Sequence, residues 1–462
     1  MLVAAAKKDD SYTIPVAPFA PAYHLSATQE RIYFNYALNP NSTAYNLPMA
    51  WELSGKIDSE KIGKALSCLI ERHESLRTTF KVEQGELLQV IVEELSAPVE
   101  KVISDDDNAV EAINAFIRPF DLARGPLIRC GIIILPSAKK ILVMDVHHIV
   151  CDGISQTLLY TDFLKIYKGE HLQPLSIQYK DYAEWEFGFK KTHNYIALRE
   201  FWLKEFETPA PVLDLPCSVP HEDNSQQGGN VLFAIDKQTY QPLFNFLKEE
   251  GITTFSGLFA IFYVFLAQLT GQDDLVIGVN TAGRIHEEVD KVIGMFVKTL
   301  PVRNKINTEA TFKSFVQQVH NHFVKASSKQ LYDLADIISE LNKGKDATVK
   351  SLFEVMFVFQ NYERELVETN NLQFIQYEFE NKTFKYPVTL FCNEGADVFH
   401  FRLEYASKYF TKADAELIAE QFETLTANIA ANPNALIIEY GDTDLVQDNK
   451  EINAAETFQF NF

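Results

Sequence analysis

The sequence HHIVCDG at residues 147–153 carries the strongest functional signal in this chain. The apolar run before it, residues 141–146, predicts a β-strand, and residues 155–168 have the apolar spacing of a helix. Two imidazoles at a strand end are thus followed by an Asp-Gly turn and a helix N-terminus. Imidazoles exchange protons near neutral pH, and helix N-termini present N–H groups to a developing oxyanion. We therefore expect acid–base chemistry on an acyl group here.

The two histidines are expected to point to opposite sides of the strand. Side chains alternate between faces, so a strand that stays regular places Asp145 with His147 and Val146 with His148. The pair is then poorly placed to bind one metal together, and at most one imidazole faces a substrate. The spacing does not choose between them, and two structural histidines beside an ordinary turn remain the alternative.

Neighbours of the histidines suggest local roles. Ser155 is the expected N-cap of the following helix, and Gly169 its stop. Gly153 permits a tight turn, and its N–H is also a candidate oxyanion donor. Cys151 is expected to be a buried thiol rather than a nucleophile, because no basic sequence neighbour lowers its pKa.

Composition narrows the class of protein. The 462 residues, 47% of them hydrophobic, suffice for two or three domains or one large two-lobed unit. A net charge of −21 argues against nucleic-acid and anionic-membrane partners. Residues 255–269 fall short of the roughly 20 apolar residues of a spanning helix, so we expect a buried core helix there. Residues 1–6 lack the leading basic region of a signal peptide.

The cysteines predict neither a disulfide framework nor a metal site, because they are scattered and without CxxC spacing. We therefore expect a reducing, cytoplasmic compartment. The five are Cys68, Cys130, Cys151, Cys217 and Cys392.

Hydrophobic periodicity indicates a mixture of helices and strands in both halves of the chain. Residues 126–135 and 141–148 predict a hairpin. Residues 206–228, rich in Pro, Asp, Ser, Gln and Gly, predict a connector between two lobes. Strict βα alternation, a dinucleotide fingerprint and a phosphate loop are all missing from the sequence. The expected helices are 60–72, 155–168, 244–250, 255–269, 312–325 and 414–430, and the expected strands of the second half are 275–279, 353–359 and 398–405.

Further blocks of sequence, in order, make the chain resemble the condensation domains of nonribosomal peptide synthetases, within the chloramphenicol acetyltransferase-like superfamily. The resemblance covers residues 23–432, nearly the whole chain. Its blocks are residues 25–34, 72–80, 147–153, 177–185, 282–284 with 293–297, and 356–361.

This resemblance implies an α+β fold of two acetyltransferase-like lobes in a V, with a tunnel between them. The expected limits are a lead-in at 1–22, a first lobe at 23–205, a second lobe at 229–432 and a linker at 433–462. Carrier proteins would insert a phosphopantetheine arm from each end, one bearing a donor acyl or peptidyl thioester and the other an acceptor aminoacyl thioester. The resemblance also implies that the domain forms an amide, has a neighbouring adenylation domain and is monomeric when isolated. It implies neither a metal nor a tightly bound cofactor.

The resemblance also implies roles for individual residues. It makes His148 the catalytic histidine, as base or as positioning group, and His147 its buried neighbour. It gives Asp152 a structural role in a buried salt bridge to Arg77, with Arg72 as the second choice; orienting a histidine is the alternative.

Three residues of the second half are candidates to line the tunnel. Gln360 and Asn361 are either tunnel-lining or ordinary strand-end groups. Lys298 stands where the family usually has Asn, and a solvated or ion-paired lysine is the alternative. Residues 329–334 and 348–351 also depart from the family pattern.

Other functions stay open beside amide formation. The same fold could make esters or epimerise a residue, or a non-catalytic domain could recruit partners; a metal hydrolase is a more distant alternative. Within the leading hypothesis, residues 72–80 and 147–155 resemble the subtype whose donor ends in an L-residue.

Overall fold

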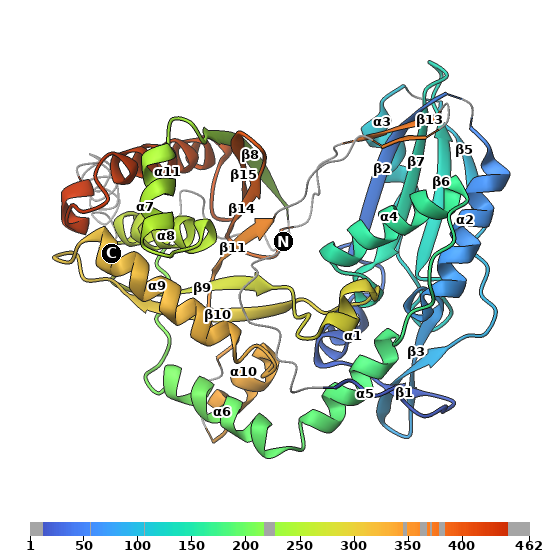
Figure 1. Cartoon of the computed structure of the whole chain (residues 1–462), viewed down its shortest axis with the longest axis horizontal. Helices are drawn as coiled ribbons and strands as arrows, with labels where there is room; N and C mark the ends of the chain where they lie inside the picture. Colours follow the sequence, from blue (N-terminus) through green and yellow to red (C-terminus); the bar gives the residue numbers. More distant parts are fainter. Residues whose placement is uncertain are drawn as a thin grey trace, which may run out of the picture.

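Two lobes, each built around a six-stranded sheet, make up the structure, and they diverge as a V in Figure 1. The computed structural model describes residues 13–441 except 56, 106, 217–226, 345–348, 361–366, 370–371 and 378–383. The predicted α+β class and two-lobed arrangement are confirmed. The connector predicted at 206–228 has no helix or strand over residues 207–216, and most of its remainder lies outside the described residues.

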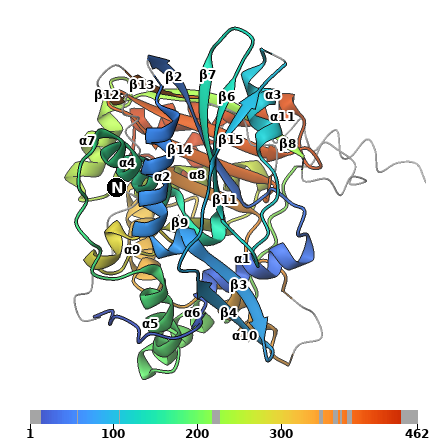
Figure 2. The same ribbon diagram turned by 90° about the vertical axis from the view of Figure 1, so that its right-hand side faces the viewer.

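The main sheet of the first lobe has the order β12-β13-β2-β7-β6-β5. Its central hairpin, β6 with β7, is the one predicted from sequence, and β5 pairs with β6 in parallel. A small sheet, β1-β4-β3, lies below it in Figure 2. The elements are β1 (Tyr23–His24), α1 (Ala27–Leu38), β2 (Asn46–Gly55), α2 (Ser59–Arg72), η1 (Glu74–Arg77), β3 (Thr78–Glu83), β4 (Glu86–Ile91), β5 (Val99–Ile103), α3 (Ala109–Phe116), β6 (Ile128–Ile134), β7 (Lys140–His147), η2 (His148–Val150), α4 (Gly153–Lys168) and α5 (Tyr179–Phe189).

The strand β7 shows why the hairpin forms where it does. Its side chains alternate, as a period of two requires. Leu142 and Met144 belong to the core that includes α2 and α4, whereas Ile141 and Val143 pack in the smaller core around α3. Both faces are therefore covered, which fits the nearly continuous apolar run in the sequence.

The sheet of the second lobe has the order β10-β9-β11-β14-β15-β8, with β11 parallel to both of its neighbours. The helix α8 is the predicted core helix, and every residue from 255 to 266 in it is buried. The elements are α6 (His193–Glu205), β8 (Gly228–Asp236), α7 (Gln241–Glu249), α8 (Thr254–Thr270), β9 (Asp274–Thr281), η3 (Glu287–Lys291), β10 (Lys298–Lys305), α9 (Phe312–Ser327), α10 (Leu334–Asn342), β11 (Val355–Gln360), β14 (Val388–Glu394), β15 (Val398–Ala406), α11 (Lys412–Ala431) and η4 (Ile437–Tyr440).

Two segments of the second half cross over to the first lobe. The strand β13 (Leu372–Gln376), joined by β12 (Val367–Thr369), pairs with β2 and extends the first sheet. Its Phe374 packs edge-on against Phe163 and Tyr167 of α4. The loop between β9 and β10 places Ile293 and Phe296 in the first lobe's core. The range predicted for the second lobe, 229–432, thus contains segments that complete the first lobe.

The linker predicted at 433–462 starts too early. Residues 433–441 pack on the second lobe, because Ile437 and Tyr440 of η4 are buried in its core. Leu436 also forms a β-bridge with Thr311. Residues 442–462 lie outside the described part of the chain.

Within the described residues, no single helix is long and apolar enough to cross a membrane. The helices α7 and α8 satisfy length and composition only as a pair, and they meet at a bend of 112°.

Candidate active site

The two histidines lie where β7 gives way to a short 3-10 turn. The strand ends at His147, and His148 begins η2, so the regular strand assumed through both residues stops between them. The backbone N–H of His147 donates to Leu127, and that of His148 donates to Tyr45. The change of backbone direction gives the two imidazoles different surroundings.

His147 is a buried, neutral imidazole. His147 is 3% exposed, and its ring packs edge-on against the rings of Tyr36 and Phe120. The Nδ1 atom accepts the Ile149 N–H at 3.2 Å, so the ring proton lies on Nε2. Burial, reinforced by the positive charge of neighbouring groups, lowers the pKa of His147 to about 3.

His148 is half-buried and has the opposite tautomer. Its Nδ1 lies 2.8 Å from the Cys151 carbonyl oxygen. A carbonyl only accepts, so Nδ1 carries the proton and the Nε2 lone pair is free to accept one. Burial, followed by the charge of Lys385, lowers the pKa of His148 to about 4. The imidazole is therefore neutral and basic at Nε2 at neutral pH.

Asp152, and not Ser155 as predicted, caps the helix α4. Its Oδ1 accepts the Ser155 N–H at 2.8 Å. Its Oδ2 accepts the Phe296 N–H at 3.0 Å, and Arg284 lies 3.4 Å from Oδ1. Asp152 is completely buried, so these contacts from the β9–β10 loop fasten the histidine motif to the crossing segment.

The salt bridge predicted between Asp152 and Arg77, or Arg72, is therefore wrong. Arg77 donates to the Val92 carbonyl at 2.7 Å and lies 3.6 Å from Glu74. Arg72 pairs with Asp162 at 3.1 Å. Arg284 belongs to the block at 282–284 that resembles the family, so the sequence does contain this arginine in a recognisable motif. Spacing alone does not show which arginine reaches the Asp152 carboxylate.

Two glycines allow the crossing loop to approach this closely. Gly283 has φ +66°, and a Cβ there would lie 1.7 Å from the Phe296 oxygen. A Cβ on Gly294 would lie 1.8 Å from the Tyr179 ring. Ser155, instead of capping its helix, accepts the Gly294 N–H at 3.0 Å and donates to the Gly294 carbonyl at 2.8 Å. The loop is thus held to the start of α4 by close packing and hydrogen bonds.

Gly153 and Cys151 follow the histidines at the start of α4. Gly153 is the first residue of α4 and does not have a positive φ. Its N–H makes no hydrogen bond to the described residues, which leaves the oxyanion role as a prediction. Cys151 is fully buried, and burial raises the pKa of its thiol well above the usual range.

A cavity of about 400 Å³ has His147, and not His148, among its described lining residues. The C-terminal half of α1, the loop after it and His147 line one side, and Lys385 and Tyr386 line the other. Lys385 was missed at the sequence level, because a single lysine before a strand carries no motif. Its ammonium lies 3.9 Å above the Tyr45 ring, which itself lies 6.4 Å from the His148 ring.

Lys298 is buried and ion-paired. Its side chain is 2% exposed, and its Nζ lies 2.6 Å from Glu186 and 3.9 Å from Asp333. It therefore forms a buried ion pair between β10 and α5, which is the ion-paired alternative predicted for it beside a place in the tunnel. Gln360, at the end of β11, is partly buried and not part of the cavity lining, and Asn361 lies outside the described residues.

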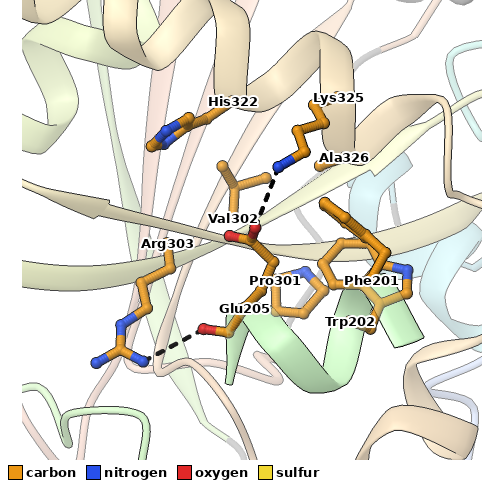
Figure 3. Close-up of a pocket in the computed structure, with 9 residues that line it drawn as sticks. All are labelled: Phe201, Trp202, Glu205, Pro301, Val302, Arg303, His322, Lys325 and Ala326. Carbon is orange, nitrogen blue, oxygen red and sulfur yellow. Dashed lines mark hydrogen bonds and ion pairs between the residues drawn. The ribbon is translucent and has the colours of Figure 1, made fainter. Parts of the chain in front are cut away.

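A second cavity offers no room for a substrate. It lies between α6, β10 and α9 and measures about 10 Å³, enough for about one water (Figure 3). Its charges are engaged: Lys325 lies 3.6 Å from Glu205, and Arg303 binds Asp274 at 2.7 Å. In the described part of the chain, no group of three or more His, Cys, Asp or Glu side chains is arranged to hold a metal.

Comparison with known proteins agrees with this geometry. The model of the condensation domain family matches residues 20–450. The chain belongs to the condensation domain family. Bacitracin synthase 1 of Bacillus licheniformis is 33% identical over 420 residues, which is 90% of this chain and 8% of that protein. Tyrocidine synthase 3 of Brevibacillus parabrevis is 33% identical over 441 residues, 94% of this chain and 7% of that protein.

Solved structures share the fold of this condensation domain. The X-domain from teicoplanin biosynthesis has a TM-score of 0.83 at 20% identity, over 92% of this chain and 99% of that one. The first condensation domain of the calcium-dependent antibiotic synthetase, in complex with a substrate analogue, has a TM-score of 0.76 at 17% identity, over 90% of this chain and 98% of that one. The predicted acetyltransferase-like lobes are therefore confirmed as the architecture.

Proposed function

We propose that this condensation domain joins a donor acyl or peptidyl thioester to the amine of an acceptor aminoacyl thioester. The amine nitrogen attacks the thioester carbonyl carbon. A C–N bond forms, the C–S bond breaks, and the proton lost by the amine ends on the departing thiol. Both reactants would be held on phosphopantetheine arms of carrier proteins.

The tautomer of His148 is the observation that carries this proposal. The Cys151 carbonyl fixes the proton on Nδ1, so Nε2 is left as the acceptor atom of the ring. Because burial holds the pKa of His148 near 4, the imidazole does not need to lose a proton before it accepts one from the amine. Family membership supports the same role for the histidine motif.

His148 can act as a base, as a positioning group, or as both. General base catalysis typically contributes about 10²–10⁴-fold. Fixing two reactants in register can contribute about 7–11 kcal/mol. Two tethered arms that meet at His148 gain mainly from the second effect, so we propose that positioning is the larger contribution.

The proposed partners are an upstream donor carrier, a downstream acceptor carrier and a neighbouring adenylation domain, in the cytoplasm. Support comes from relatives of which this chain spans only 7–8%. A further structure with the same fold is a four-domain nonribosomal peptide synthetase bound to AMP and glycine.

The direct test uses two carrier proteins, each loaded with a simple aminoacyl thioester. After this domain is added, intact mass spectrometry should show a dipeptidyl thioester on the acceptor carrier. Donors loaded with L- and D-residues should both be tried, and we propose that the L-donor reacts faster. No dipeptide with any loaded pair, from a well-folded domain, would contradict amide formation.

A second candidate function is partner recruitment without catalysis. The structure of an X-domain in complex with OxyB, from teicoplanin biosynthesis, has a TM-score of 0.83 to this chain, so the fold does not by itself decide. The same carrier assay separates the two, because a recruiting domain would bind loaded carriers and leave both thioesters intact. Ester formation or epimerisation would appear in the products as a hydroxyl acceptor consumed or a donor of inverted configuration.

A further inference from the structure

The 400 Å³ cavity lined by His147 presents a cation that has no counter-charge among the described residues. Lys385 reaches it from the second lobe, just before β14, and its ammonium rests over Tyr45 at 3.9 Å. None of the described residues that line the cavity is Asp or Glu, and none of the described carboxylates lies within ion-pair distance of Lys385. The acidic group that acts on it electrostatically, Glu404 of β15, is itself paired with Arg402 at 2.8 Å.

Lys298 is a buried lysine that has a carboxylate partner. Lys298 lies 2.6 Å from the Glu186 carboxylate, which is equally buried. Lys385 differs in both respects, because the residue is exposed at the cavity and no described carboxylate forms an ion pair with it. Among the described residues, Lys385 rests on the face of the Tyr45 ring and is otherwise exposed to the cavity.

The remaining lining suits a small polar anion. Asn35, Asn39 and Ser42 offer side-chain hydrogen-bond donors from α1 and the loop after it. Burial, followed by the charge of Arg31, lowers the pKa of Lys385 to about 8, so the ammonium is still mostly charged at neutral pH. The volume lies in the range of small-molecule sites.

We infer that this cavity binds a side-chain carboxylate of the substrate, with Lys385 as its ion-pair partner, so that the domain prefers an acidic residue on one of its two arms. This inference rests on the proposed condensation reaction and specifies its substrate class. The phosphate of a pantetheine arm is the other anion at hand. It lies at the opposite end of the arm from the thioester, whereas the cavity is lined by His147 and by Tyr45, whose ring lies 6.4 Å from that of His148.

The test compares matched acidic and amide substrates. Glutamyl and glutaminyl carriers, then aspartyl and asparaginyl carriers, are supplied in turn as donor and as acceptor against a constant neutral partner. On one arm, the wild-type domain should use the acidic substrate with kcat/KM about 10–100-fold above its amide, as expected for a charge-assisted contact. Lys385→Met should remove that preference and Lys385→Arg should keep most of it. Lys191→Met is the matched control, because Lys191 also lies 3.9 Å above an aromatic ring, that of Phe187, outside the cavity.

Two results would overturn the inference. One is a wild-type domain that uses acidic and amide substrates equally on both arms. The other is Lys385→Met slowing acidic and amide substrates alike while its melting temperature is unchanged, which would assign the lysine to a group that all substrates share, such as the arm's phosphate.

A binding experiment separates this inference from the proposed reaction. N-acetylglutamyl and N-acetylglutaminyl pantetheine amides carry neither phosphate nor a cleavable thioester, and their affinities can be measured by calorimetry. Tighter binding of the glutamyl compound, lost in Lys385→Met and kept in Lys191→Met, would support the site even if no dipeptide formed. Equal affinities would contradict it even if condensation proceeds.

Discussion

The Asp152 carboxylate and the Arg284 guanidinium lie 3.4 Å apart in a site closed to solvent. They join the histidine motif to the β9–β10 loop, which crosses from the second half of the chain. The start of α4 and the crossing loop therefore depend on one another, and the orientation of His148 depends on both.

Substitution of either partner should damage folding. Asp152→Ala and Arg284→Ala should each lower the free energy of unfolding by about 3–5 kcal/mol, because the remaining charge is left buried and unpaired. Arg77→Ala is the matched control and should cost within about 1 kcal/mol, since its ion pair with Glu74 is partly exposed. Urea unfolding measures all three. A soluble Asp152→Ala protein of wild-type stability that no longer turns over would point instead to a direct chemical role.

The buried pair of Lys298 and Glu186 gives a second stability prediction. Lys298→Met should destabilise the fold by about 3–5 kcal/mol, because Glu186 loses its cation in a site that is 2% exposed. Adding Glu186→Gln to Lys298→Met should recover part of the loss, which a double-mutant cycle reports as coupling. Additive effects of the two substitutions would show that the pair is not coupled.

Local features of this site could be predicted from the sequence, whereas its long-range partners could not. Two apolar runs around a short polar turn located the β6–β7 hairpin, and a motif located the two imidazoles at its end. The partner of Asp152 was misassigned because Arg72, Arg77 and Arg284 look alike in sequence, and only the crossing of the β9–β10 loop selects one of them.

Two further misses have physical reasons. Ser155 looks like an N-cap, but Asp152, three residues earlier, caps the helix by accepting the Ser155 N–H. The crossover of β13 into the first sheet depends on pairing with β2, hundreds of residues away, and a short strand carries no mark of its partner. Lys385 reaches the site by the same long-range geometry.

The pH dependence of the reaction should reflect the amine and not His148. Burial holds the pKa of His148 near 4, so protonation of the imidazole removes its base only well below neutrality. A free α-amino group has a pKa of about 7.7–8.0, so the rate should rise with pH as the acceptor amine loses its proton. Single-turnover rates from pH 5.5 to 9 should show no separate acid limb near the ordinary histidine pKa. A limb there that vanishes in His148→Ala would contradict a buried, neutral imidazole.

The transfer should be direct, without a covalent acyl-enzyme. Cys151 is the residue of the motif that could act as a nucleophile. It is fully buried, and burial raises the pKa of its thiol well above the usual range. Cys151→Ala should keep most of the activity, and incubation with a loaded donor carrier alone should leave the domain's mass unchanged. A stable mass increase equal to the acyl group, abolished by Cys151→Ala, would show a ping-pong route.

The most direct measurement is the rate of dipeptidyl thioester formation by wild-type, His147→Ala and His148→Ala domains, followed by intact mass in the two-carrier assay. His148→Ala should keep its melting temperature and lose about 10²-fold or more of the rate, because we propose that Nε2 of this residue accepts the amine proton. His147→Ala should mainly lose stability, since its buried ring packs between Tyr36 and Phe120. Condensation by His148→Ala at the wild-type rate would contradict the account.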